Sequence, residues 1–134
     1  MRTREMIETH PVSAPIDAVL LIRCIEACAS CEQTCIACAD ASLGEDDLAE
    51  LVRCIGLDLI CADLCATTEA TLTRFTVFEP RLVALVVEAC LDACQRCADE
   101  CEKHADHHEH CRISAEECRI CAQACADVLG ALPS

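Results

Sequence analysis

The sequence predicts an all-α protein, an antiparallel up-down-up-down four-helix bundle with a short N-terminal tail. Between residues 14 and 130 there is no sustained alternation of apolar and polar residues of the kind that strands show. Long stretches rich in Ala, Leu, Glu and Cys are interrupted only by a few helix start and stop signals. The connections between these stretches are short, so consecutive helices are expected to be antiparallel. The 134 residues form one domain, with a tail at 1–13 and a bundle at 14–134.

The first predicted helix covers about residues 14–41, with Pro15 in its first turn and Gly44 just beyond its end. The second begins at Ser42 and Glu45, which have the spacing of a capping box, and continues to about residue 72.

The third predicted helix opens at Thr76, Glu79 and Pro80 and ends near residue 105. Asp106 and Glu109 repeat the capping-box spacing and start the fourth helix, which runs toward Gly130.

The 16 cysteines follow the helical period on all four predicted helices. Steps of three and four residues keep side chains on one face of a helix, so the cysteines are expected to line the inside of the bundle. The spacing C-x3-C-x2-C-x3-C occurs on both the first and the third helix, as a partial internal repeat. The four helices contribute, in order, Cys24, Cys28, Cys31, Cys35 and Cys38; Cys54, Cys61 and Cys65; Cys90, Cys94, Cys97 and Cys101; and Cys111, Cys118, Cys121 and Cys125.

Charge and targeting signals restrict the partners of the chain. Ten basic residues against 24 acidic ones give a net charge of −14, which repels phosphate backbones and anionic lipids, so neither nucleic acid nor a membrane is expected as a partner. The longest apolar run, residues 82–87, is far shorter than the roughly 20 residues of a membrane span. Residues 1–15 contain no apolar stretch of the secretory kind, so we expect a cytoplasmic protein. Because thiols stay reduced there, the cysteines are interpreted as metal ligands before disulfides.

The choice between metals depends on charge. Four zinc sites of four thiolates each would bury a charge of about −8 in a chain that is already acidic. A Cu(I) ion replaces one thiol proton by one positive charge, and soft thiolates select Cu(I). If each thiolate bridges two ions, the capacity is about one copper per cysteine, roughly 16 or slightly more. Such a number indicates storage, whereas a metallothionein-like Zn/Cd buffer remains the alternative.

An enzyme is not expected, because the thiols of a redox enzyme lie at an exposed helix N-terminus beside basic groups. These cysteines instead lie in helix interiors.

The cysteine stripes, together with the segment CEKHADHHEHC from Cys101 to Cys111, resemble the cytosolic copper storage proteins over about residues 14–130. That resemblance implies a four-helix bundle whose core is filled with Cu(I) thiolate clusters. It also implies a homotetramer that stores or sequesters Cu(I), with a copper chaperone or a small thiol as the possible donor.

One end of the bundle is rich in histidine. The seam of the third helix continues from Cys101 to His104 and His108, so these two are the expected copper ligands, while His107 and His110 are possible mouth residues that face water. The opposite end carries an apolar plug without cysteine, and copper is therefore expected to enter at the histidine end.

Three further features complete the prediction. Asp58 replaces a cysteine on the seam of the second helix, where it is either a weak copper ligand or hydrogen-bonded to thiols or His. Met6 and His10 could offer soft ligands in the tail.

The second helix is apolar around nearly its whole circumference at residues 51–64, which predicts that it lies in a subunit interface.

Overall fold

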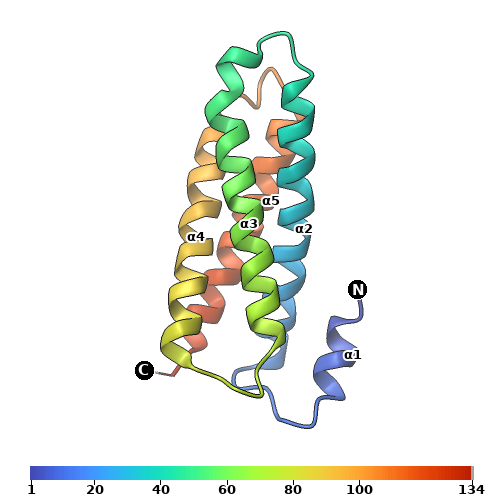
Figure 1. The fold of residues 1–134 in the computed structure, drawn as a ribbon, viewed down its shortest axis with the longest axis vertical. Coiled ribbons are helices and arrows are strands. Elements are labelled where there is room, and N and C mark those ends of the chain that lie inside the picture. The colour runs from blue at the N-terminus through green and yellow to red at the C-terminus, as the bar shows by residue number, and fades with distance from the viewer. Residues whose placement is uncertain (134) are drawn as a thin grey trace.

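The computed structural model describes residues 1–133, and within them all regular structure is helical. A short helix, α1 (Thr3–Glu8), precedes α2 (Ala18–Leu43), and a 3-10 turn, η1 (Leu48–Leu51), leads into α3 (Val52–Thr73). Then follow α4 (Pro80–Glu102) and α5 (Glu109–Ala131). The four long helices run side by side, which confirms the predicted up-down-up-down bundle (Figure 1).

Each long helix packs against two others, because α2 and α4 both contact α3 and α5. The pairs α2/α4 and α3/α5 are therefore diagonal across the bundle axis. The α2–α3 and α4–α5 connections lie at one end of the bundle, and the α3–α4 connection lies at the other (Figure 1). No helix within residues 1–133 combines the length and apolar character that crossing a bilayer requires.

The starts of α2, α3 and α5 differ from prediction, and none of the capping boxes expected at Ser42, Thr76 and Asp106 forms. The backbone N–H of Val19 donates to the Asp17 carboxylate at 2.8 Å, so α2 begins at Ala18 and Pro15 precedes it. Ser42 does not start the next helix: it belongs to the last turn of α2, and its hydroxyl is buried in the bundle one turn beyond Cys38. At α5 the N-cap position is His108, without a side-chain cap.

The N-terminal tail is ordered, although the sequence left it undefined. Residues 3–8 form α1, in which Thr3 is buried and Ile7 packs against the core. Farther on, the ring of His10 lies 4.3 Å from that of Phe75. The tail therefore folds back onto the end of the bundle that the α3–α4 connection closes, while the side chain of Met6 is exposed.

The apolar plug at that same end is present, and its innermost layer takes one side chain from each long helix. These four are buried, and the burial of each contributes about 1.5–3 kcal/mol. They are Leu21, Leu72, Val83 and Val128. Phe75 is buried beside them, whereas Val19, near the start of α2, is 47% exposed.

Candidate metal centre

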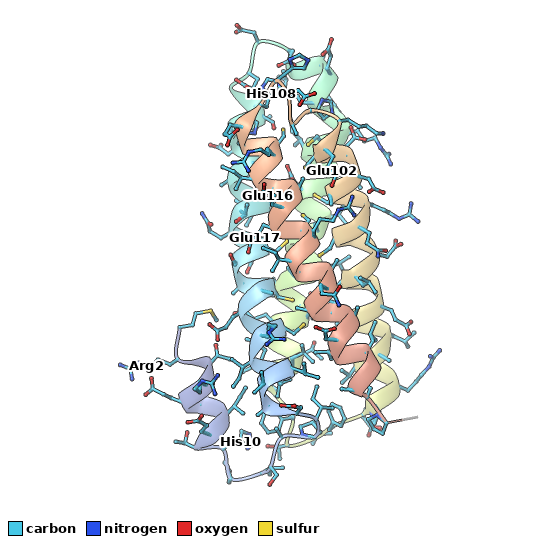
Figure 2. The ribbon with its side chains drawn as sticks, turned by 180° about the vertical axis from the view of Figure 1, so that it is seen from behind. Arg2, His10, Glu102, His108, Glu116 and Glu117 are labelled. Atoms are coloured by element: carbon cyan, nitrogen blue, oxygen red, sulfur yellow. The ribbon has the colours of Figure 1, made fainter. Side chains whose placement is uncertain are left out.

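All 16 cysteines are free thiols and lie inside the bundle. None is more than 2% exposed. The sulfur atoms are drawn along the bundle interior in Figure 2. The prediction that the helical period directs every cysteine inward is therefore confirmed.

The inward positions of the four helices stack as layers, each of which takes one residue from each helix. From the histidine end inward we name a mouth layer, an oxygen layer, two middle layers and a blind layer, which abuts the apolar plug. Their members are Cys38, Cys54, Cys101 and Cys111 (mouth); Cys35, Asp58, Cys97 and Ser114 (oxygen); Cys31, Cys61, Cys94 and Cys118, then Cys28, Cys65, Cys90 and Cys121 (middle); and Cys24, Thr68, Val87 and Cys125 (blind).

Sulfur atoms approach one another both within and between these layers. In the mouth layer the Sγ atoms of Cys54 and Cys101 are 3.4 Å apart. In the first middle layer Cys61 lies 3.6 Å from Cys94 on the neighbouring helix. The same Cys61 is 4.0 Å from Cys65, one turn farther along α3. The thiols thus form a column that extends over several layers rather than isolated pairs.

Potential four-ligand sites in this column share their members. Cys31 belongs to one set with Cys65, Cys94 and Cys121, and to another with Cys35, Cys61 and Cys118. Cys121 also belongs to a third set, with Cys28, Cys90 and Cys125. Because one sulfur serves two sets, the geometry suits bridging thiolates better than isolated tetrahedral sites.

Contacts between the thiols shift their pKa values in both directions. Hydrogen bonds from Cys125 and Cys118 lower the pKa of Cys24 and Cys35, respectively, to about 5. Hydrogen bonding to neighbouring thiols, and then burial, raise the pKa of Cys31, Cys65 and Cys97 above the ordinary value. A bound cation is therefore needed to displace these protons.

The oxygen layer interrupts the column. The hydroxyl of Ser114 donates to Asp58 Oδ1 at 3.0 Å, and the Cys97 thiol donates to the same oxygen at 3.2 Å. Asp58 Oδ2 is buried without a partner. Burial, and then the nearby sulfurs, raise the pKa of Asp58 to about 10, so this carboxyl group is neutral at physiological pH. Asp58 is therefore part of the core, as predicted, and also belongs to a set with Cys38, Cys54 and Cys101.

His110 is the histidine that approaches the thiols. Its Nδ1 atom lies 3.4 Å from Cys38 Sγ and 3.6 Å from Cys111 Sγ. The three side chains form a set that could hold one ion. His110 was predicted to face water, but its ring points toward the thiols, because His110 lies in the first turn of α5, whose N-cap residue is His108.

The other histidines are held by carboxylates or face solvent. His104 Nε2 donates to Glu100 at 3.0 Å, and the side chain of Glu100 is only 8% exposed. Burial raises the pKa of Glu100, but hydrogen bonds from His104 and Lys103 more than offset this and hold it below its usual range. His108 contacts Glu45 through Nδ1 and Asp47 through Nε2, the latter at 2.9 Å. His107 is exposed.

Some residues of this site were missed at the sequence level. Ser114 and Thr68 continue the cysteine seams of their helices by steps of three, so the spacing contains a signal for both. Glu45, Asp47 and Glu100 carry no such signal, because a charged residue near a helix end is ordinarily solvated.

Comparison with known proteins adds family evidence. The family model described as copper storage protein matches residues 18–130. The solved structure of the copper storage protein from Streptomyces lividans loaded with 10 copper equivalents superposes with a TM-score of 0.95 at 44% identity, covering 97% of this chain and 99% of that one.

Two further relatives are similar. A cytosolic copper storage protein from Streptomyces lividans with five coppers superposes with a TM-score of 0.85 at 47% identity, covering 86% of this chain and 96% of that one. The uncharacterized cysteine-rich protein YhjQ of Bacillus subtilis is 38% identical over 71 residues. That stretch is 53% of this chain and 65% of the relative, so the match spans about two thirds of that curated protein's length.

Proposed function

The chain belongs to the copper storage protein family, and we propose that it stores or sequesters many Cu(I) ions in the cytosol as thiolate clusters inside its four-helix bundle. The column of buried free thiols carries this proposal, because neighbouring Sγ atoms lie 3.4–4.0 Å apart on both sides of the oxygen layer. Each Cu(I) replaces one thiol proton, so filling the core leaves the interior charge unchanged. We expect about 16 ions per chain, with a few more at the histidines.

A Zn/Cd buffer is not favoured. Zinc requires separate tetrahedral sites, whereas the four-thiol sets here share Cys31 and Cys121. Filling them as tetrathiolates would also bury excess negative charge in a chain whose net charge is already −14.

The same geometry supports a binding role rather than catalysis. A thiol enzyme needs a reactive, accessible cysteine. Each cysteine here is at most 2% exposed, so a substrate the size of another protein's disulfide has no access to it.

We assign the 16 cysteines and Asp58 as core ligands, with His110 completing the mouth layer through Nδ1. His104 and His108 are proposed as ligands on the entry route. Because both ring nitrogens of His108 contact carboxylates, it receives an ion only when one of these contacts opens.

Titration of the reduced apo-protein with Cu(I), and separately with Zn(II), tests the function. We expect saturation at about 16 Cu(I) with one proton released per ion. Saturation at about four ions, with Zn(II) bound more tightly, would overturn the proposal in favour of the buffer.

Stopped-flow loading tests the entry route. Replacing His104 and His108 together by Ala should slow filling and leave the capacity nearly unchanged. Replacing Cys31 and Cys94 together by Ser, in the first middle layer, should lower the capacity without slowing the first ions. Unchanged rates in the double histidine variant would show that copper enters elsewhere.

We also propose that the chain assembles as a homotetramer through α3. The side chains of Val52, Leu59 and Ile60 are 64%, 45% and 54% exposed in the single chain, on a helix whose opposite face is already in the core. A partner subunit would remove this apolar surface from water. Sedimentation that shows a monomer at micromolar concentration would contradict this assembly.

We propose that the donor of Cu(I) to the chain is a copper chaperone or a small thiol.

A further inference from the structure

One carboxylate oxygen joins two histidines above the mouth layer. Glu45 Oε2 lies 3.3 Å from His110 Nε2 and also contacts Nδ1 of His108. The two imidazole rings are stacked, with centroids 5.4 Å apart. Glu45 belongs to the α2–α3 connection and the histidines to the α4–α5 connection, and both connections close the same end of the bundle (Figure 1; His108 is labelled in Figure 2).

These contacts determine which nitrogen of His110 carries a proton. An ionised carboxylate only accepts hydrogen bonds, so His110 Nε2 must donate to Glu45. A neutral imidazole has one N–H, and Nδ1 therefore presents its lone pair to the sulfurs of Cys38 and Cys111 at 3.4 and 3.6 Å. The opposite tautomer would direct a proton at the place where an ion must bind.

Glu45 is itself held in place from the other side. The two nitrogens of His108 both face carboxylates, so His108 donates to Glu45 through Nδ1 and to Asp47 through Nε2, at 2.9 Å to the latter. The side chain of His108 is 11% exposed, which limits competition from water for these hydrogen bonds.

We propose that Glu45 is a positioning residue for copper entry: it holds His110 in the Nε2–H tautomer, so that Nδ1 is ready to bind Cu(I) together with Cys38 and Cys111. Carboxylates that accept the second N–H of a ligating histidine tune metal sites in general, and their loss costs about 10- to 100-fold in metal affinity or activity. This inference rests on the proposed function for its consequence, but the tautomer itself is a property of the apo-protein.

The chain offers a matched control in the same connection. Asp46 is exposed and makes no side-chain hydrogen bond or ion pair with any of residues 1–133. Asp46→Asn therefore removes the same charge as Glu45→Gln, one residue away, without touching a histidine. Glu45→Ala removes the acceptor completely, and Glu45→Asp keeps the carboxylate.

The first readout is the ¹⁵N spectrum of the histidine rings in the reduced apo-protein. We expect His110 as the Nε2–H tautomer in the wild type, in Asp46→Asn and in Glu45→Asp, and a mixture or the Nδ1–H form in Glu45→Gln and Glu45→Ala. An unchanged Nε2–H tautomer in both Glu45→Gln and Glu45→Ala would overturn the inference.

The second readout is stopped-flow loading with Cu(I). We expect Glu45→Ala to slow the first phase by about 10-fold while the final number of ions stays the same. Equal slowing in Asp46→Asn would also overturn the inference, because the effect would then belong to net charge at the mouth. Failure of the wild type to take up Cu(I) would reject the proposed function, whereas the tautomer result would be unaffected.

Discussion

Replacing Asp58 by Asn should remove the pH dependence that this one buried carboxyl group imposes on the stability of the apo-protein. Asp58 is fully buried on the inner face of α3 and accepts hydrogen bonds from Ser114 and Cys97 through Oδ1. An Asn side chain has the same shape and retains this acceptor. What changes is that the amide cannot ionise.

The magnitude follows from the pKa of the carboxyl group. Its pKa is 3.8 in the unfolded chain and about 10 in the folded one, mainly because of burial. Between these values the folded state holds a proton that the unfolded state has lost, so the free energy of unfolding falls as the pH rises. At pH 7 this costs the wild type about 4 kcal/mol at most, because pH 7 lies about three units above the pKa of the unfolded chain and each unit corresponds to about 1.4 kcal/mol.

The Asn side chain introduces an opposing cost. Its NH₂ group takes the place of Oδ2, which has no partner in the core. An unpaired buried donor destabilises by about 1–3 kcal/mol. We therefore expect Asp58→Asn to be more stable than the wild type by about 1–3 kcal/mol at pH 7 and less stable by about the same amount near pH 4.

Denaturant unfolding of both reduced apo-proteins across this pH range measures the difference directly. Asp63→Asn, on the exposed side of the same helix, serves as the control for loss of a carboxylate. A difference between Asp58→Asn and the wild type that stays constant with pH would refute the reasoning, because Asp58 would then not be protonated by folding.

Three other predictions test the plug, the blind layer and the histidine end. Leu21→Ala should lower the unfolding free energy of the apo-protein by about 2–5 kcal/mol, measured in denaturant, with no change in copper capacity, since Leu21 lies in the plug and contributes no ligand. Thr68→Cys should raise the capacity by about one Cu(I), measured by titration, because it extends the α3 seam with one more thiol; no increase would show that the blind layer is not filled. Asp47→Asn should lower the melting temperature more at about pH 5.5 than at about pH 9. The reason is that hydrogen bonding to Asp47 raises the pKa of His108 above 6.5. The stabilisation of the folded state by this pair is therefore complete below pH 6.5 and is lost as the pH rises through the pKa of His108 in the folded protein. Equal effects at both pH values would contradict that pairing.

The sequence alone determined the fold class and the interior position of every cysteine. The reason is that steps of three and four residues select one face of a helix whatever the helix packs against. The same reasoning correctly placed Asp58 in the core. It predicted the start of α4 at Pro80 but not that of α3, because the hydroxyl of Ser42, expected to cap that helix, is buried at the end of α2 instead.

Only the tertiary structure decided which atoms meet. His110 faces Cys38, and Glu45, which lies 65 positions earlier in the chain, contacts the other side of the same ring. Both contacts depend on how two connections meet at one end of the bundle. Likewise the hydrogen bond between Asp58 and Ser114 depends on the relative height of α3 and α5, which are diagonal partners. Helical periodicity specifies the face that a residue occupies, but the axial register and rotation between helices come from packing of the whole bundle, and no local pattern in the sequence contains them.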